Sequence, residues 1–411
     1  MLRWRRPRSA RPRIVVLVEN LPLAQDRRLE KQTRTLADAG YDVTVVCRRD
    51  PGNRAVPGVR VAEYPAPRDA ESKLGFVREY AVSWLLTALV LARVAVRPGF
   101  DLLVTCAPPD LWFPIGLMAR AFGRPVVYDQ RDSSPELYAS RYGSGGRVAG
   151  LLRLLERASY RSADHVIVAN GSFARLARTR GGVPAERVTV VGNGPVLAAT
   201  APRPPRPELR AGRAQLCCWI GAMGPQDHVD LGVRVVHHLV HKEGRTDCTF
   251  AFVGDGEARA DAVRLAAELG VEEWVSFPGF LPQDDVFDYL ATADVGIDPG
   301  LDDTVAPVKA VEYMAFRLPF VAFDLREVSA LAGDAACYAP PGDVARFAEL
   351  VADLLDDPAA RDRLGRAGRH RVETSLAWDH QAVPYLAVFD ALLRPAAGAR
   401  LLRGEDRVRG R

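Results

Sequence analysis

Residues 302–325 read DDTVAPVKAVEYMAFRLPFVAFDL, and this stretch decides the fold because a helix and a strand follow one another in it. Pro307 suits a first helical turn, since its missing N–H would have no intrahelical partner there. The run after it is apolar except for Lys309 and Glu312, and 319–323 is an apolar run of strand length. A helix that leads directly into a buried strand is typical of a parallel α/β sheet.

The same alternation of strand-like and helix-like runs extends outward through the whole chain. Strands are predicted in the first half at 13–18, 41–48, 101–107, 125–130, 165–169 and 188–192. Strands are predicted in the second half at 216–220, 249–253, 275–279, 295–298, 319–324 and 336–340. Two βαβ series of this kind predict two doubly wound sheets, and ligands bind such sheets beyond the carboxyl ends of the strands.

A proline- and arginine-rich segment separates the two series. TAPRPPRPELRAGR (200–213) can continue neither a helix nor a strand, and it indicates a linker. We expect an α/β protein of two Rossmann-like domains facing an interdomain cleft. The predicted parts are a basic tail (1–12), an acceptor domain (13–196), the linker (197–214), a donor domain (215–375), a helix crossing back to the first domain (376–394) and a basic tail (395–411).

Composition describes an ordinary globular protein with unevenly placed charge. The 411 residues are 48% hydrophobic and 26% charged, with a net charge of +4. Trp4 is the one aromatic residue in the arginine-rich ends (1–12 and 395–411), so these ends do not favour nucleic-acid binding. They are either solvated tails or a means of peripheral contact with an anionic membrane. The uncharged run 80–92 is too short to span a bilayer, and it is either core or a membrane-facing helix.

The cysteines and the start of the chain indicate a reducing compartment. None of the six cysteines forms a CxxC pair, and most lie in apolar runs. No signal peptide is apparent, so we expect a cytoplasmic protein, with peripheral association at the inner face of the membrane as an option. His237 and His241 lie one helical turn apart, but no third metal ligand is evident nearby. We expect neither a metal nor a cofactor.

Glycine-containing loops follow two predicted strands of the second half. Gly221 and Gly224 follow 216–220, and Gly254 and Gly256 follow 249–253. Glycines at such turns let backbone N–H groups approach an anion. Neither loop fits GxGxxG, so dinucleotide binding has little support. Each loop alone is no more than a tight turn, but together they favour a phosphate-bearing ligand.

Lys309 and Glu312 occupy one face of the helix that follows Pro307. A lysine and free N–H groups at a helix N-terminus suit a diphosphate. The carboxylate one turn later suits a pair of neighbouring hydroxyls, as in ribose. The alternative is a surface ion pair, which the apolar neighbours of both residues make less expected.

The chain resembles glycosyltransferase family 4, whose fold is called GT-B. PVKAVEYMAFRLPFVAFDL resembles the donor-site segment of that family, and further blocks resemble the family in its order. Those blocks are DRRLEKQTRTLADAGYDVTVVC, CAPPD, VVYDQRDSSPELYASRYG, GAMGPQDHVD, FVGDGE and LPQDDVFDYLATADVGIDP. The resemblance implies a retaining, metal-independent transferase that moves a sugar from a UDP- or GDP-linked donor to a glycan or lipid-linked acceptor. It also implies that Glu312 holds the donor ribose.

Four positions depart from the pattern of the family. Thr304 stands where members often carry a second glutamate, and the neighbouring Asp302 and Asp303 are candidate replacements. Residues 226–228, Gln-Asp-His, replace a basic pair, which leaves Lys309 as the main cation for the diphosphate. Arg131 replaces a histidine and cannot act as a base. Arg317 replaces a helix-ending glycine, at a cost of about 1 kcal/mol if its backbone is left-handed.

The primary hypothesis is therefore a hexosyl- or N-acetylhexosaminyl-type transferase of polysaccharide or glycolipid biosynthesis. Lys309, Glu312 and the glycine loops would bind the donor, while Arg131, Asp132 and Glu136 would face the sugar and the acceptor. The first alternative is a catalytically weak relative that binds a nucleotide sugar or a partner transferase. The second is a nucleotide-sugar epimerase or a phosphorylase on the same fold.

Overall fold

The computed structural model describes residues 11–19, 21–55, 57–65, 73–143, 145–200 and 203–393. The tail 395–411 and residues 1–10 of the N-terminal tail lie outside these ranges. The chain divides into two compact units, which are described separately. Unit 1 comprises Met1–Ala139, Gly143–Val191 and Ala382–Arg411, and unit 2 comprises Ser140–Tyr142 and Gly192–Gln381.

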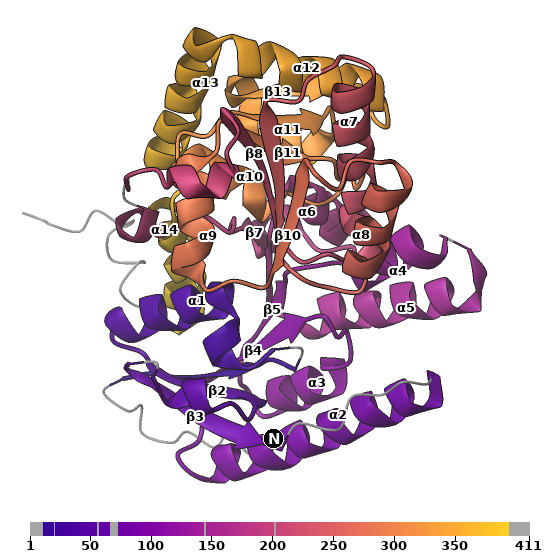
Figure 1. Cartoon of the computed structure of the whole chain (residues 1–411). Helices are drawn as coiled ribbons and strands as arrows, with labels where there is room; N and C mark the ends of the chain where they lie inside the picture. The colour runs from indigo at the N-terminus through magenta and orange to yellow at the C-terminus, as the bar shows by residue number, and fades with distance from the viewer. Residues whose placement is uncertain are drawn as a thin grey trace, which may run out of the picture. The chain divides into compact units, whose positions relative to one another are not determined.

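Unit 1 is built on a parallel sheet of seven strands in the order β3-β2-β1-β4-β5-β6-β7 (Figure 1). The strands are β1 (Arg13–Leu17), β2 (Asp42–Arg48), β3 (Val59–Tyr64), β4 (Leu102–Ala107), β5 (Val126–Gln130), β6 (His165–Val168) and β7 (Val188–Val190). All residues of β4 and β5 are buried, as expected for central strands covered on both faces. The connections change direction between β1 and β4.

The helices of unit 1 are α1 (Arg27–Asp38), α2 (Lys73–Val96), α3 (Phe113–Ala121), α4 (Ser134–Tyr142), α5 (Gly146–Ser162), α6 (Gly171–Thr179) and the later part of α14 (Trp378–Leu393). Helices α3 and α5 pack against each other (Figure 1), and Trp84 of α2 donates a hydrogen bond to the carbonyl of Leu111 at 2.9 Å. Tyr41, after α1, donates to Asp390 of α14 at 2.5 Å. The C-terminal helix is thereby fixed to unit 1.

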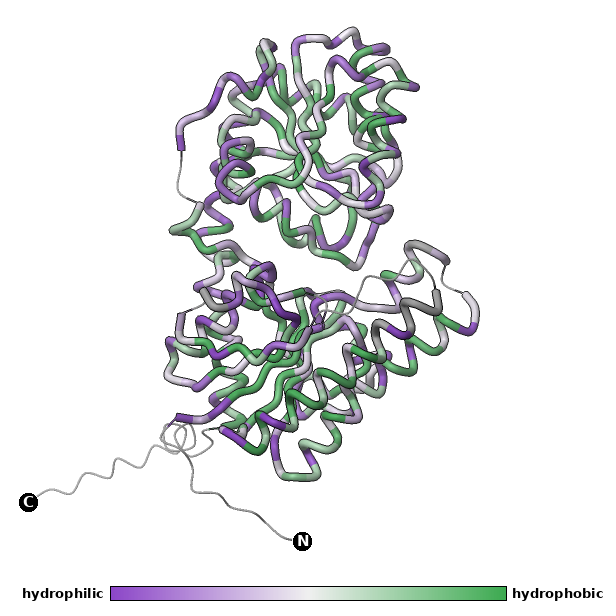
Figure 2. The backbone as a smooth tube through the Cα atoms, turned by 60° about the horizontal axis from the view of Figure 1, so that its bottom comes forward, coloured by the Kyte–Doolittle hydropathy of each residue, from purple (hydrophilic) through white to green (hydrophobic). Residues whose placement is uncertain are grey.

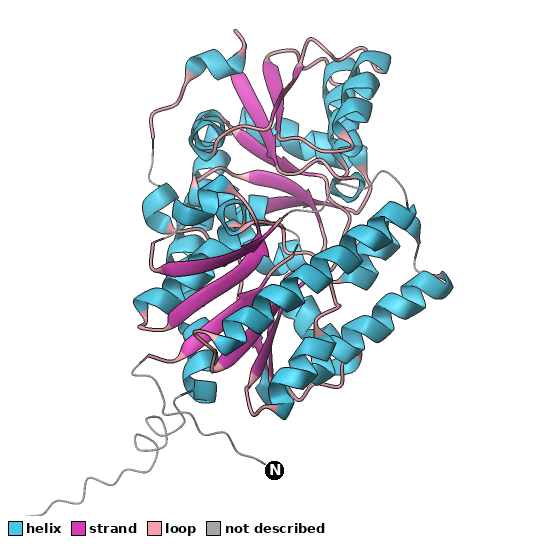
Figure 3. Ribbon diagram, turned by 90° about the horizontal axis from the view of Figure 1, so that it is seen from below, coloured by secondary structure: helices cyan, strands magenta, loops and turns pink. Residues whose placement is uncertain are grey.

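Unit 2 is built on a parallel sheet of six strands in the order β10-β9-β8-β11-β12-β13. The strands are β8 (Gln215–Ile220), β9 (Cys248–Val253), β10 (Val275–Gly279), β11 (Val295–Asp298), β12 (Phe320–Phe323) and β13 (Ala336–Ala339). The helices are α7 (Val229–His241), α8 (Arg259–Glu268), α9 (Gln283–Thr292), α10 (Val308–Ala315), α11 (Arg326–Ala332), α12 (Val344–Asp356) and α13 (Pro358–Arg371). Figure 3 shows the strands of each sheet side by side with helices along them.

The core of unit 2 explains why its strands are continuous apolar runs. Along β8, Cys217 and Trp219 belong to one hydrophobic cluster and Leu216, Cys218 and Ile220 belong to another. Successive side chains of a strand point to opposite faces, so both faces of this sheet are buried. The apolar runs stand out along the strands in Figure 2. The predicted parallel α/β architecture with two doubly wound sheets is confirmed.

The cysteines are free thiols, and five of the six are buried. Among the described residues, no helix combines the length and the apolar character that are needed to cross a membrane.

Candidate functional site

The predicted donor residues gather at the carboxyl edge of the sheet of unit 2. Gly221 directly follows β8, Gly254 directly follows β9, and Asp298 is the last residue of β11. Strands β8 and β11 are neighbours, and the chain leaves them in opposite directions along the sheet. This is the switch point at which parallel sheets bind their ligands.

The glycine loops touch one another through their backbones. Gly254 has φ +144°, and a Cβ atom there would lie 1.8 Å from the carbonyl oxygen of Gly221. Gly256 has φ +155°, and its Cβ would lie 2.6 Å from the carbonyl oxygen of Met223. Real Cβ atoms do not approach backbone this closely, so only glycine fits at these two positions. The close approach leaves the strand ends lined by backbone instead of side chains.

Lys309 lies at the start of α10, as the sequence predicts, because Pro307 is the N-cap of the helix and Val308 is its first residue. Its ammonium nitrogen lies 3.4 Å from Oδ1 of Asp298, 3.7 Å from Oδ1 of Asp227 and 4.7 Å from the centre of the Trp219 ring. The side chain is only 11% exposed. Two carboxylates and an aromatic face thus contact the cation at this edge of the sheet.

Glu312 and Asp303 have different surroundings. Glu312 lies one turn after Lys309 on α10 and is partly buried. Asp303 accepts a hydrogen bond from the backbone N–H of Arg326 at 2.7 Å, and its other oxygen lies 3.3 Å from the guanidinium of the same residue. Arg326 is the first residue of α11, so Asp303 satisfies the N-terminus of that helix. Its role as a second donor carboxylate stays a prediction.

In unit 1, Arg131 follows β5 and is bound to three side chains. Its guanidinium donates to Asp129 at 3.2 Å, to Gln32 at 3.1 Å and to Asp26. Only 9% of the side chain is exposed. Burial would raise the pKa of Asp129, but the charges of Arg28 and Arg131 outweigh this effect and lower it. Arg131 therefore fastens the end of β5 to the N-terminus of α1, which Asp26 caps.

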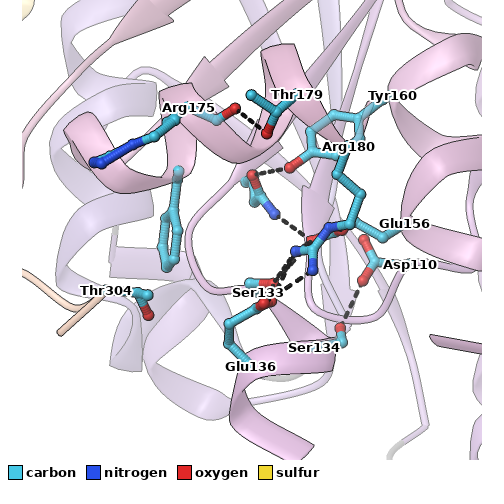
Figure 4. Close-up of polar contacts among 12 residues, drawn as sticks. Asp110, Ser133, Ser134, Glu136, Glu156, Tyr160, Arg175, Thr179, Arg180 and Thr304 are labelled. Atoms are coloured by element: carbon cyan, nitrogen blue, oxygen red, sulfur yellow. Dashed lines mark hydrogen bonds and ion pairs between the residues drawn. The ribbon is translucent and has the colours of Figure 1, made fainter. Parts of the chain in front are cut away.

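The next residue, Asp132, is exposed, and Glu136 lies in the first turn of α4. Arg180, at the end of α6, donates to both carboxylate oxygens of Glu136 at 2.9 and 2.7 Å (Figure 4). Burial would raise the pKa of Glu136, but the hydrogen bonds from Arg180 and Ser133 outweigh it and lower the pKa. The carboxylate of Glu136 is thus kept charged and held in one orientation.

Behind this pair lies Glu156 of α5, whose side chain is completely buried. It accepts hydrogen bonds from Gln130 at 2.9 Å and from Ser133 at 2.8 Å, and Arg180 contacts it as well (Figure 4). Burial raises the pKa of Glu156 to about 7. Two carboxylates therefore share one guanidinium next to the loop that carries Asp132.

Several of these residues were not singled out from the sequence. Asp298 had a signal, since it is an acid at the end of an apolar strand at the predicted switch point. Arg180 and Glu156 had none, because each lies far along the chain from Glu136 and no motif or spacing connects the three residues. Among the described residues, no group of three or more His, Cys, Asp or Glu is arranged to hold a metal ion.

Two family models match the chain, one in each half. The model described as "Glycosyl transferase 4-like domain" matches residues 24–194, and the model described as "Glycosyl transferases group 1" matches residues 214–357. Together with the two parallel α/β units, these matches define the class: the chain is a glycosyltransferase of the GT-B fold. It belongs to glycosyltransferase family 4.

Similar proteins carry the names of glycosyltransferases. The 2-deoxystreptamine glucosyltransferase of Streptomyces kanamyceticus is 27% identical over 384 residues, which are 88% of this chain and 97% of that protein. The MMP alpha-(1->4)-mannosyltransferase of Mycolicibacterium hassiacum is 27% identical over 404 residues, 89% of this chain and 94% of that protein.

Solved structures share the fold. Sucrose-phosphate synthase of Thermosynechococcus elongatus has a TM-score of 0.78 at 19% identity, covering 94% of this chain and 100% of that one. Anabaena HepE in complex with UDP-glucose has a TM-score of 0.72 at 17% identity, covering 92% of this chain and 99% of that one.

Proposed function

We propose that this glycosyltransferase transfers a sugar from a nucleotide-diphosphate sugar to an acceptor hydroxyl, with retention of the anomeric configuration and without a metal ion. One observation carries the proposal: Lys309 lies at the N-terminal turn of α10, at the same strand edge as the glycine loops of Gly221 and Gly254. Backbone N–H groups, a helix N-terminus and a nearby ammonium group are the features that a diphosphate requires.

The chemistry follows from where charge develops. As the bond between the sugar and the diphosphate breaks, negative charge grows on the departing phosphate oxygen. Lys309 and the amides of α10 stabilise this charge, and the amides need little reorganisation because the helix already holds them in place. Glu312 accepts hydrogen bonds from the ribose hydroxyls, and Gly221, Gly224, Gly254 and Gly256 let the backbone approach the donor.

The residues of unit 1 would act on the acceptor side. Asp132 and Glu136 would contact the transferred sugar or the acceptor hydroxyl, and Arg131 would hold the loop that presents them. The arginine stays charged at neutral pH and cannot accept a proton, so its contribution is electrostatic and structural.

The donor and the acceptor are proposed by class. A UDP- or GDP-linked hexose is the proposed donor, and the complex of HepE with UDP-glucose supports the UDP form. The proposed acceptor is a glycan or a lipid-linked sugar. The names 2-deoxystreptamine glucosyltransferase and D-inositol 3-phosphate glycosyltransferase among the similar proteins support a small soluble acceptor as the alternative.

A turnover assay tests the proposal. Purified protein is incubated with UDP- and GDP-linked sugars and a panel of glycan, lipid-linked and small cyclic acceptors, with and without EDTA. We expect a product whose anomeric configuration, read by NMR, equals that of the donor, and whose yield EDTA does not reduce. A product of inverted configuration, or activity abolished by EDTA, would contradict the mechanism.

Donor binding tests the site separately. Replacing Glu312 with Ala removes a charged hydrogen-bond acceptor worth about 1.5–3 kcal/mol, so the donor dissociation constant should rise roughly tenfold or more. Glu349→Ala is the matched control, because Glu349 is an exposed acid of α12 paired with Arg346. Equal donor affinity of both variants, measured by calorimetry, would remove Glu312 from the site.

Thr304, Gln226 and Arg131 differ from the residues that the family usually has at these positions, and these differences favour one alternative function. A catalytically weak relative would bind the nucleotide sugar and act on a partner transferase. The turnover assay separates the two, because donor binding without turnover across the whole panel favours the rival. Product formation without an acceptor, or with phosphate as the acceptor, would indicate an epimerase or a phosphorylase.

Peripheral association with the inner face of the membrane is part of the proposal. Exposed leucines lie on α2 (Leu85, 54%; Leu89, 50%) and on α5 (Leu151, 53%; Leu154, 63%). The exposed face of α5 also carries four arginines, namely Arg147, Arg153, Arg157 and Arg161, and its single acid is buried. Apolar side chains interleaved with arginines fit an anionic lipid surface.

Sedimentation with phosphatidylglycerol vesicles tests this association. The double variant Leu151→Asp, Leu154→Asp should no longer sediment with the vesicles, whereas Val263→Asp, at an exposed apolar position of α8, should sediment like the wild type. Binding to neutral phosphatidylcholine vesicles as strong as to anionic ones would contradict the role of the arginines.

A further inference from the structure

Asp227 places a negative charge inside the glycine loop that follows β8. Its Oδ2 accepts a hydrogen bond from the backbone N–H of Gly224 at 3.1 Å, and its Oδ1 lies 3.7 Å from the ammonium nitrogen of Lys309. The carboxylate therefore uses both the loop amide and the cation that a diphosphate would use.

The net charge of the groups around Lys309 is unfavourable for binding an anion. Asp298, which is 5% exposed, has its Oδ1 3.4 Å from the same ammonium nitrogen. One cation thus faces two carboxylates. Like charges only a few ångströms apart repel strongly near a protein surface, so each carboxylate opposes a diphosphate next to Lys309.

The two carboxylates differ in how they are held. Asp298 is the last residue of the central strand β11, and its backbone is fixed by the sheet. Asp227 ends a single 3-10 turn, Pro225–Asp227, and its side chain is 24% exposed. Asp227 is therefore the partner that can release Lys309 or take up a proton from water.

We propose that Asp227 limits the affinity for the donor, and that the nucleotide sugar binds with uptake of one proton by Asp227 while Lys309 turns from this carboxylate to the diphosphate. This inference rests on the proposed donor site. Asp227 is then a positioning residue that acts through Lys309. Its protonation sets the pH dependence of donor binding.

The electrostatic surroundings support proton uptake. Burial raises the pKa of Asp227 and the charge of Asp298 raises it further, while Lys309 and the amide of Gly224 act in the opposite direction. These three are the charged or hydrogen-bonding groups that face the carboxylate from β11, α10 and the loop. A bound diphosphate adds negative charge and draws Lys309 away, so both changes stabilise the protonated form.

Calorimetry of the full chain with UDP-glucose and GDP-mannose tests the inference. The diphosphate of these donors carries no titrating proton between about pH 6 and about pH 8, so protons taken up on binding belong to the protein. The wild type should bind one of the two nucleotide sugars and take up as much as one proton per donor bound. Proton uptake is measured by repeating the titration in buffers of different ionisation enthalpy, since the heat of binding then changes with the buffer. Its affinity should fall as the pH rises across this range.

Asp227→Asn should remove the proton uptake and bind the donor about tenfold more tightly near pH 8, since one opposing charge is gone. Asp230→Asn is the matched control, because Asp230 is a nearby acid of α7 that lies 4.0 Å from His228, and it should behave like the wild type.

The outcomes separate this inference from the proposed function. Wild-type binding without proton uptake, or an Asp227→Asn variant that binds no more tightly than Asp230→Asn, overturns the role of Asp227 and leaves the donor site standing. The absence of binding of either nucleotide sugar by all three proteins overturns the donor site and the inference together. Wild-type binding without proton uptake overturns the inference even where a variant fails to fold.

Discussion

The carboxylate of Glu156 lies 2.6 Å from Nε of Arg180, and the same guanidinium holds both oxygens of Glu136 on its other edge. Glu156 is completely buried on α5, whereas Glu136 is 27% exposed at the start of α4. A buried acid thus fixes the arginine that orients an accessible acid (Figure 4). The arrangement couples the packing of three helices to the loop that carries Asp132.

Stability should depend on the protonation of Glu156. Its pKa is raised from 4.5 to about 7 in the folded protein, so the folded state binds this proton more tightly than the unfolded state. The free energy of unfolding of unit 1 should therefore fall by up to about 3 kcal/mol between about pH 4.5 and about pH 7 on account of this group. Glu156→Gln cannot titrate and should lose this part of the pH dependence.

Hydrogen exchange of the β5 amides, which lie in the buried centre of the sheet of unit 1, measures that free energy. Glu136→Gln is the control, because the pKa of Glu136 is lowered and its contribution is lost only as the pH falls. A pH profile of Glu156→Gln that parallels the wild-type profile between about pH 4.5 and about pH 7 would disprove the assignment.

Arg180 should hold the first turn of α4 in place. Removing its charge leaves Glu136 and the buried Glu156 without their shared partner, and the loss of one member of a buried ion pair costs about 3–5 kcal/mol. In Arg180→Met, the amides of 133–142 should exchange faster and turnover should fall, while donor affinity stays unchanged because the donor site lies in unit 2.

Arg180→Lys should restore part of the turnover. Arg175→Met is the matched control on α6, since Arg175 is exposed and bonds Ser172. A drop in donor affinity equal to the drop in turnover would show that Arg180 acts on something other than the 131–136 loop.

The architecture could be predicted from the sequence because buried parallel strands must be continuously apolar. The runs around Trp219 and Val321 alternate between two covered faces, so no polar residue interrupts them. The start of α10 could be predicted for a similar reason, since Pro307 fixes where the helix begins. Both signals are local, and local signals are the ones that a single sequence carries.

The site could be predicted only in part because its electrostatics are not local. Lys309 and the glycine loops follow from strand ends, but Asp227 and Asp298 meet Lys309 only through the sheet order β8-β11. The contact of Arg180 with Glu156 joins the end of α6 to the middle of α5, and no spacing in the sequence marks it. The resemblance to the family indicates that a basic pair is missing at 226–228. The structure adds that Asp227 of this loop pairs with Lys309.

Gly254 should tolerate no side chain. Its Cβ would overlap the carbonyl oxygen of Gly221, and backbone cannot move aside as the end of a flexible side chain can. Gly254→Ala should therefore destabilise unit 2 by several kcal/mol or displace the Gly221 loop, with loss of donor binding in either case. At Gly300 a Cβ meets only ordinary contacts, so Gly300→Ala is the control. Wild-type melting and donor affinity in Gly254→Ala would contradict the contact between the loops.

Arg317 should be replaceable by glycine with a gain in stability. Arg317 follows Phe316, the C-cap of α10, and has φ 57°. This is the left-handed backbone that the comparison with the family's glycine suggests, and the side chain is exposed. Glycine adopts this conformation without the Cβ penalty of about 1 kcal/mol. Arg317→Gly should therefore unfold at higher denaturant than Arg317→Ala, by about 1 kcal/mol in the free energy of unfolding of unit 2. Because both variants lose the same arginine contacts, the difference between them isolates the backbone. Equal denaturation midpoints for the two variants would show that the left-handed residue costs nothing here.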